Sequence, residues 1–263
     1  MPSTAHVRAQ VEAALQDRIP GALNLRSFPQ PATLLTGIRE VDTATGGIPI
    51  SSVTEVWAPP GVSSGKTTLL LSLFAAVTHR QLACALVDAI DCFDPSSAHA
   101  AGVNLARLLW VRCGGEGKTT GKIVHEKPAL KPLEQAFKAA DILLQVGGFG
   151  LIVVDLGNLA PQSVQKVPLT TWFRFSRVVE RVSTALVFIT PVHVAASCIP
   201  LVLKPRTGDA LWATPTTSIA LSHAILLRHL PIEFEVVRGR NFTSERKPVQ
   251  SANARFAAEP IWA

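Results

Sequence analysis

The residue types that bind an anion lie together in one short stretch. It reads Pro59-Pro-Gly-Val-Ser-Ser-Gly-Lys-Thr-Thr68 and lies between a strand-like segment and an apolar run with helical spacing. Backbone N–H groups at the start of a helix converge on one point, and the helix dipole adds partial positive charge there. The sequence therefore predicts a phosphate site built from consecutive residues: Gly61, Val62, Ser63, Ser64, Gly65, Lys66, Thr67 and Thr68.

Lys66 and Thr67 add the groups that a nucleotide requires. In a phosphate loop of this kind the lysine reaches the β- and γ-phosphates, and the hydroxyl that follows it binds Mg²⁺. Asp155 is a second group directed to the metal, because it ends the apolar run Leu151-Ile-Val-Val-Asp155. The loop and the strand together predict a site for ATP and Mg²⁺, with Thr67 and Asp155 serving the metal.

The loop departs from the usual pattern at its start. The pattern G-x-x-x-x-G-K-[ST] expects glycine at position 60, where this chain has Pro60, and Gly61 follows one residue late. Proline has no N–H to donate, but the N–H groups from position 61 onward remain. A loop that has kept its shape and lost its ligand is the alternative.

A similar stretch, Gly114-Gly-Glu-Gly-Lys-Thr-Thr120, lacks the first glycine and a following apolar helix, so it predicts a basic loop.

The segments around these motifs alternate between two periodicities. Apolar runs typical of strands occupy residues 52–57, 83–88, 108–112, 150–155, 185–190, 220–229 and 233–237. Runs with helical spacing occupy residues 4–18, 66–79, 95–102, 133–145 and 170–184, and irregular stretches occupy 22–36, 113–132 and 193–218. Alternation of fully apolar strands with helices predicts an α/β fold, in which a mostly parallel sheet has helices on both faces.

The composition excludes several classes of protein. The chain has 263 residues, of which 48% are hydrophobic and 17% charged, so wholesale disorder is excluded. Its four cysteines form no C-x-x-C pair, so neither structural zinc nor a disulfide framework is expected. No apolar run reaches the roughly 18 residues of a membrane span, and the N-terminal residues lack the plan of a secretory signal. We expect a cytoplasmic protein with reduced thiols and no membrane partner.

Positive charge is concentrated in the second part of the chain. The net charge is −2 over residues 1–95 and +8 over residues 96–263, which suits a polyanion or an acidic partner. Three arginines share the spacing i, i+3, i+7 of one helix face, and two lysines lie in a stretch rich in glycine and lysine. These candidate contacts to DNA or to an acidic protein are Arg174, Arg177, Arg181, Lys118 and Lys122. A solvated charged surface is the alternative.

Taken in order, the motifs resemble those of RecA recombinases. The resembling stretches are Leu35-Thr-Gly-Ile-Arg-Glu-Val-Asp42 with Gly46-Gly-Ile-Pro49, Ser63-Ser-Gly-Lys-Thr-Thr68, Leu86-Val-Asp-Ala89 with Asp94-Pro95, Ile152-Val-Val-Asp155, and Val236-Val-Arg-Gly-Arg240. The resemblance implies a RecA-like phosphate-loop ATPase core over residues 35–245. It sets apart an N-terminal helix and linker arm over residues 1–34, a candidate for oligomerisation, and a C-terminal tail over residues 246–263. It also implies that Asp94 lies at the edge of the nucleotide and that Arg238 and Arg240 reach the nucleotide of a neighbouring subunit.

The family's catalytic positions are changed in this chain. Its catalytic glutamate follows an Asp-Ala pair, and after Asp88-Ala89 this chain has Ile90. Asp91 is the next residue, but in an extended chain it would point the opposite way, so it is a weak candidate for the catalytic base. Ser97 stands near the place of an adenine-stacking tyrosine, and Pro191 stands where a glutamine senses the γ-phosphate. We expect ATP binding with weak or absent hydrolysis.

The DNA-contacting loops of the family are changed as well. The first is shortened between Pro161 and Thr170, and the proline-rich residues 193–218 replace the second. What remains resembles ImuA-type proteins, which are RecA-like accessory factors of the bacterial mutasome. That resemblance implies a nucleoid-associated role in damage-induced (SOS) error-prone repair and translesion synthesis. It implies two protein partners, a Y-family-like polymerase relative and an error-prone polymerase of the replicative type.

Two other functions stay open at this point. One is an active recombinase that hydrolyses ATP in a filament on single-stranded DNA. The other is a nucleotide-independent scaffold with a vestigial phosphate loop. Binding of single-stranded DNA and homo-oligomerisation are therefore expectations beside the polymerase partners.

Overall fold

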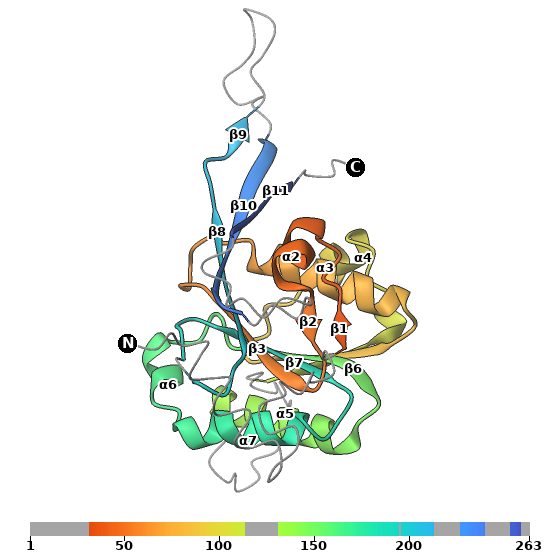
Figure 1. The fold of residues 1–263 in the computed structure, drawn as a ribbon, viewed down its shortest axis with the longest axis vertical. Helices are drawn as coiled ribbons and strands as arrows, with labels where there is room; N and C mark the ends of the chain where they lie inside the picture. Colours follow the sequence, from red (N-terminus) through yellow and green to blue (C-terminus); the bar gives the residue numbers. More distant parts are fainter. Residues whose placement is uncertain (1–31, 114–130, 195, 213–226, 240–252, 259–263) are drawn as a thin grey trace, which may run out of the picture. The chain divides into compact units, whose positions relative to one another are not determined.

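The computed structural model describes residues 32–113, 131–194, 196–212, 227–239 and 253–258. In this part of the chain most strands form one large sheet with the order β11-β10-β8-β3-β7-β6-β4-β5 (Figure 1). Its strands are β3 (Ser52–Trp57), β4 (Ala83–Asp88), β5 (Leu108–Arg112), β6 (Phe149–Asp155), β7 (Ala185–Thr190), β8 (Leu201–Thr207), β10 (Leu227–Arg238) and β11 (Asn253–Ala258). The short strand β9 (Leu211–Trp212) pairs with β10 beside this row.

The middle of the sheet is parallel. β3 pairs in parallel with β7 and β8, β4 with β5 and β6, and β6 with β7. The row becomes antiparallel at β10, which pairs with β8 and β11. Every residue of β7 is buried, as expected for a parallel strand that is covered on both faces. The predicted α/β fold with a mostly parallel sheet is confirmed.

Helices cover both faces of the sheet (Figure 1). One face carries α3 (Lys66–His79) together with α2 (Arg39–Thr45) and α4 (Pro95–Ala100), and the other carries α5 (Pro132–Val146) and α7 (Leu169–Val179). Because side chains alternate along a strand, each strand supplies both cores. On β7, Val187 belongs to the cluster under α3, whereas Phe188 belongs to the cluster under α5 and α7.

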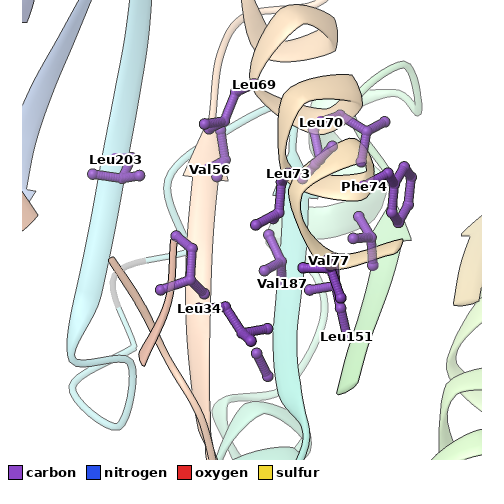
Figure 2. Packing of buried hydrophobic residues seen from close by; sticks show 14 of the residues in the cluster. Leu34, Val56, Leu69, Leu70, Leu73, Phe74, Val77, Leu151, Val187 and Leu203 are labelled. Atoms are coloured by element: carbon purple, nitrogen blue, oxygen red, sulfur yellow. The ribbon is translucent and has the colours of Figure 1, made fainter. Parts of the chain in front are cut away.

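The helix that follows the phosphate loop is anchored along one side. Figure 2 shows leucine, phenylalanine and valine side chains of α3 pointing at Val56, Val187 and Leu151 of the sheet. The buried apolar residues of α3 are Leu69, Leu70, Leu73, Phe74 and Val77. Their spacing places them on one helix face, so their burial fixes the direction in which α3 begins at Lys66.

Aromatic rings fill the core on the opposite face. Trp172 and Phe175 of α7 lie with ring centroids 5.1 and 5.3 Å from that of Phe188. Phe137 of α5 completes the group, at 5.7 Å from Trp172. Edge-to-face contacts of this kind add to the stabilisation that burial alone provides.

Four predicted strands and the predicted helix over residues 66–79 have the predicted bounds, but other elements differ. The predicted helix over residues 170–184 ends at Val179, because the N–H groups of Arg181 and Val182 bind carbonyls three residues back and close the last turn. The predicted strands 220–229 and 233–237 are one strand within the described residues, β10. Pro231 lies within this strand, opposite Ala257 of β11. Although proline has no N–H to donate, its carbonyl accepts a hydrogen bond from the N–H of Gly208 at 2.9 Å.

Further elements lie where irregular structure was predicted. Residues 193–218 contain β8, whose Pro205 masked the strand pattern. Pairing of β8 with β3 stops at Leu203, so Pro205 lies beyond that ladder. β1 (Thr33–Leu34) pairs antiparallel with β2 (Ile48–Pro49), and α6 (Pro161–Gln165) follows β6. β1 and β11 lie in the segments that the sequence sets apart as arm and tail. The predicted helix over residues 4–18 lies outside the described residues.

Among the described residues, no helix is both long enough and apolar enough to cross a membrane.

The aromatic core makes a prediction about stability. Phe175→Ala should lower the free energy of unfolding by about 3–5 kcal/mol, because it removes a fully buried ring from a packed cluster. Phe173→Ala, in the same helix, is the matched control. Its side chain is 41% exposed, so the loss should be under about 1 kcal/mol. Urea unfolding of both variants measures the difference, and equal losses would show that α7 does not face the sheet in this way.

Candidate phosphate site

The backbone of the phosphate loop depends on two glycines. Gly61 and Gly65 have φ angles of +73° and +82°, in the left-handed region. A Cβ on Gly65 would lie only 2.6 Å from Cγ2 of Ile232 on β10, whereas a Cβ on Gly61 would meet nothing within 4 Å. Gly65 is therefore required both by its conformation and by a close contact.

The loop and the start of α3 offer unused hydrogen-bond donors. No side chain caps the N-terminus of α3, which is 14 residues long. Ser64 is 4% exposed, and its hydroxyl has no hydrogen-bond partner within the described part of the chain. A buried polar group without a partner is costly, and a phosphate oxygen would supply the missing acceptor. These groups fit the phosphate predicted from the sequence.

Lys66 and Asp155 converge on the turn that follows β6. The Lys66 Nζ donates to the carbonyl of Gly157 at 3.3 Å and to Oδ1 of Asn158 at 3.1 Å. Asp155 Oδ1 accepts from the N–H of Gly157 at 2.8 Å. A Cβ on Gly157 would lie 2.9 Å from the Lys66 Nζ and 3.1 Å from Asp155 Oδ1, so the missing side chain at Gly157 leaves room for this approach. Asn158 was not predicted, and no sequence signal marks it.

Asp155 is a half-buried carboxyl whose charge is only partly compensated. Burial raises its pKa, while the Gly157 N–H and the Lys66 ammonium lower it and the Asp88 carboxylate raises it, with a net upward shift. Perturbed pKa values cluster at functional sites. Mg²⁺ is commonly held by one or two carboxylates together with phosphates, so Asp155, with the exposed Thr67, fits the metal role. Among the described residues, no group of three His, Cys, Asp or Glu could hold a metal by itself.

Asp88 is a second carboxyl at this edge of the sheet. It lies opposite Asp155 in the ladder between β4 and β6 and is 2% exposed. Its oxygens accept from the N–H groups of Ile90 at 3.3 Å and Phe93 at 2.8 Å. Asp88 therefore fixes the turn that carries position 90. It was not among the predicted site residues, although it ends an apolar strand as Asp155 does.

The residues at the predicted catalytic position do not offer a free carboxylate. Ile90 packs against the hydrophobic cluster under α5 and α7. Asp91 has a φ of +60° and forms an ion pair with the Arg112 guanidinium. The hydrogen bond from Arg112 lowers the Asp91 pKa, which makes this carboxylate a weaker base. Arg112 also lies 4.9 Å from the ring centroid of Trp110, which holds the pair at the edge of the sheet.

Asp94 caps the short helix α4. Its carboxylate accepts from the N–H groups of Ser96 at 3.0 Å and Ser97 at 3.1 Å, and from the Ser97 hydroxyl. These hydrogen bonds, that of the Ser97 hydroxyl first, lower the pKa of Asp94. The observed role of Asp94 is therefore to start α4, and contact with a nucleotide stays a prediction.

The predicted basic contacts are distributed over several places. The Arg238 Nη1 donates to the carbonyls of Ala196 at 2.8 Å and Ile199 at 3.3 Å, so this guanidinium holds a loop of its own chain. Arg174 pairs with Asp141 of α5 at 2.7 Å. Arg177 is exposed on α7, whereas Arg181 is exposed beyond the end of that helix. Three predicted residues lie outside the described residues: Lys118, Lys122 and Arg240.

The antiparallel part of the sheet holds the phosphate loop from one side. The Thr207 hydroxyl at the end of β8 donates to the Ser63 carbonyl at 2.6 Å. Ile232 of β10 lies against Gly65, as described above. The sequence places these residues more than 140 positions after the loop, and nothing in the local pattern predicts either contact.

The fold and this site define an α/β protein of the RecA-like phosphate-loop class. The family model described as the RecA N-terminal domain matches residues 26–166. The chain belongs to this family.

Curated relatives match about half or more of the chain. Protein RecA of Ectopseudomonas oleovorans is 38% identical over 131 residues, which are 49% of this chain and 32% of that protein. Protein RecA of Rickettsia massiliae (strain Mtu5) is 32% identical over 158 residues, which are 59% of this chain and 40% of that protein. The matches thus span 32% and 40% of the length of these relatives.

The two loop glycines allow a matched test of the loop geometry. Gly65→Ala should lower the free energy of unfolding by about 2–5 kcal/mol, because it combines a left-handed backbone with a clash against Ile232. Gly61→Ala imposes the same left-handed backbone, but its Cβ would meet no other atom. The free energy of unfolding should therefore fall by only about 1–2 kcal/mol. Chemical unfolding of both variants checks this order. A reversed order would contradict the contact between the loop and β10.

Asp155 allows a test of the cost of its buried charge. The folded pKa of Asp155 is raised, so ionising it opposes folding, and this cost grows as pH rises from the unfolded pKa of about 3.9 through the folded pKa. Asp155→Asn removes the cost and keeps an acceptor for the Gly157 N–H. The ligand-free variant should therefore melt at a higher temperature than wild type at pH 7, with the difference vanishing near pH 3. A variant that melts lower at pH 7 would show that the carboxylate stabilises the fold.

Proposed function

We propose that this chain binds ATP and Mg²⁺ at its phosphate loop and acts as a RecA-like accessory protein in damage-induced, error-prone DNA repair synthesis. In this role it resembles ImuA-type proteins. The nucleotide serves as a switch or structural ligand more than as fuel. The observation that carries the proposal is a contrast at one edge of the sheet. The groups that would bind the nucleotide are present there, whereas Ile90 occupies the catalytic position.

The binding half is supported by the groups around the loop. Lys66 and Asp155 meet at Gly157, the hydroxyl of Ser64 is buried without a partner in the described residues, and the start of α3 has no side-chain cap. Each of these groups would be satisfied by a nucleotide phosphate or its Mg²⁺. Arg238 and Arg240 are proposed to reach a neighbouring nucleotide only if the loop over residues 196–199 releases Arg238.

Weak turnover is supported by the turn after β4. A base that orients water must present a carboxylate or an equivalent acceptor. Ile90 presents a hydrocarbon, and the Asp91 carboxylate is engaged by Arg112. Asp88, although buried close by, uses both oxygens to accept backbone N–H groups.

The partners belong to the same proposal. Y-family-like and error-prone replicative-type polymerases are the proposed protein partners, in the cytoplasm at the nucleoid. The exposed Arg177 and Arg181, with Lys118, Lys122 and Arg174, are the proposed contacts to an acidic protein or to single-stranded DNA. Self-association through residues 1–34 is part of the proposal.

The alternative is an active recombinase that hydrolyses ATP on single-stranded DNA. The observation that favours it is the name of the relatives, which are proteins called RecA. It differs from the proposed function in one measurable quantity, the rate of phosphate release.

The experiment compares nucleotide binding and phosphate release in matched variants. Mg-ATP at 100 times its Kd should stabilise the wild type by about 2.7 kcal/mol, and Lys66→Ala should remove this stabilisation while the ligand-free protein stays folded. Lys138→Ala, an exposed lysine on α5, is the control and should bind as the wild type does. Ile90→Glu should raise phosphate release by about 10²-fold or more, whereas the uncharged Ile90→Gln should not.

Three outcomes decide between the functions. Absence of stabilisation in the wild type at millimolar Mg-ATP would leave the nucleotide-independent scaffold. DNA-stimulated phosphate release by the wild type that depends on Lys66 would establish the recombinase-type motor. Stabilisation without release above the Lys66→Ala level supports the accessory role.

A further inference from the structure

A fully buried carboxyl lies in the strand that leads to the phosphate loop. Glu55 of β3 is 0% exposed. Its Oε1 accepts from the Thr190 hydroxyl at 2.9 Å and from the Val194 N–H at 2.8 Å, and its Oε2 lies 2.8 Å from the His193 Nδ1. A buried carboxylate is tolerated only when it is well supplied with donors. Glu55 therefore fixes the segment that follows β7.

His193 is the one partner of Glu55 that also reaches solvent. Its side chain is 27% exposed, and its ring stacks on Trp57 with centroids 6.1 Å apart and an interplanar angle of 28°. Because both Glu55 oxygens act as acceptors, Nδ1 of His193 is the donor of their hydrogen bond. The other ring nitrogen, Nε2, lies on the edge of the ring away from Glu55 and has no hydrogen-bond partner in the described part of the chain.

The chain topology places His193 at the edge where the phosphate loop begins. Trp57, the last residue of β3, is opposite Thr190, the last residue of β7, and the Ala58 N–H donates to the Thr190 carbonyl at 3.1 Å. The loop starts at Pro59, immediately afterwards. On its other side β7 pairs with β6, with Ile189 opposite Asp155. His193 thus follows a strand end that lies between the loop and the strand of the metal-directed carboxyl, which is where ligands of parallel sheets bind.

We propose that His193, held by Glu55, donates a hydrogen bond from Nε2 to the terminal phosphate of the bound nucleoside triphosphate. The site thereby prefers a triphosphate over a diphosphate. This inference rests on the proposed function, since it requires a nucleotide at the loop. It adds a specificity-determining residue, His193, and a positioning residue, Glu55.

Acidic and aromatic side chains surround the ring. Donation from both nitrogens requires an imidazolium, and the buried Glu55 carboxylate pairs with that charge. The Trp57 indole attracts cations at its face, and the Lys204 Nζ already lies 4.5 Å from its ring centroid. Glu55 and Trp57 thus fix the orientation of the His193 ring at this edge of the sheet.

The test uses two variants that each keep one of the two hydrogen bonds. The amide nitrogen of asparagine takes the place of Nδ1, so His193→Asn keeps the bond to Glu55 and loses the outward donor. The amide nitrogen of glutamine takes the place of Nε2, so His193→Gln keeps the outward donor. The Kd values of Mg-ATP and Mg-ADP are measured by calorimetry for the wild type, both variants and Lys66→Ala.

His193→Asn should weaken ATP binding by about tenfold or more and leave ADP binding unchanged, because it removes one hydrogen bond to a charged group. His193→Gln should stay within about threefold of the wild type for both nucleotides. Equal weakening of ATP and ADP in His193→Asn would indicate a structural role and overturn the inference, as would unchanged ATP binding. If the wild type binds neither nucleotide, the proposed function fails as well. If the wild type and Lys66→Ala differ as expected, the function stands and only the role of His193 is decided.

Discussion

The parallel register of the central strands is the constraint on which the site depends. β3, β7, β6 and β4 run in the same direction, so their carboxyl ends meet at one edge of the sheet. Each strand is covered on both faces by mostly apolar side chains, so the polar groups that can meet a ligand lie where it ends. The phosphate loop, Asp155 and Asp88 lie at this edge for that reason. The two aromatic and aliphatic cores keep the edge in place, because a shift of one strand by one residue would exchange its two faces.

Three carboxyls near this edge, two buried and one half-buried, are held in different ways, and the difference indicates what each does. Asp88 accepts two backbone N–H groups and shapes a turn. Glu55 accepts from a hydroxyl, an N–H and an imidazole, and ties a second segment to β3. Asp155 has one backbone donor, and its pKa is raised. The carboxyl that the protein compensates least is the one placed to meet a cation.

Binding and turnover make separate demands on the same edge. Binding needs a glycine-shaped loop, a helix start and Lys66, which local sequence can encode within a few residues. Turnover needs a group aimed at the attacking water from another strand, and the turn after β4 presents Ile90 there, while Arg112 engages Asp91. A chain can therefore lose hydrolysis through a few side chains while every feature that stabilises the loop remains.

The sequence by itself determined the α/β class, the parallel sheet and the bounds of strands such as β3, β4, β5 and β7, because apolar periodicity and glycine positions are local properties. It also located the loop from Gly61 to Thr68 and Asp155. It did not reveal β8, because Pro205 interrupts the strand pattern, and it placed the end of α7 too late. Only the tertiary structure joined Thr207 to Ser63, Ile232 to Gly65, Arg112 to Asp91 and His193 to Glu55. Each of these contacts joins residues more than 20 positions apart, and such pairs become neighbours only after the sheet has fixed the order of its strands.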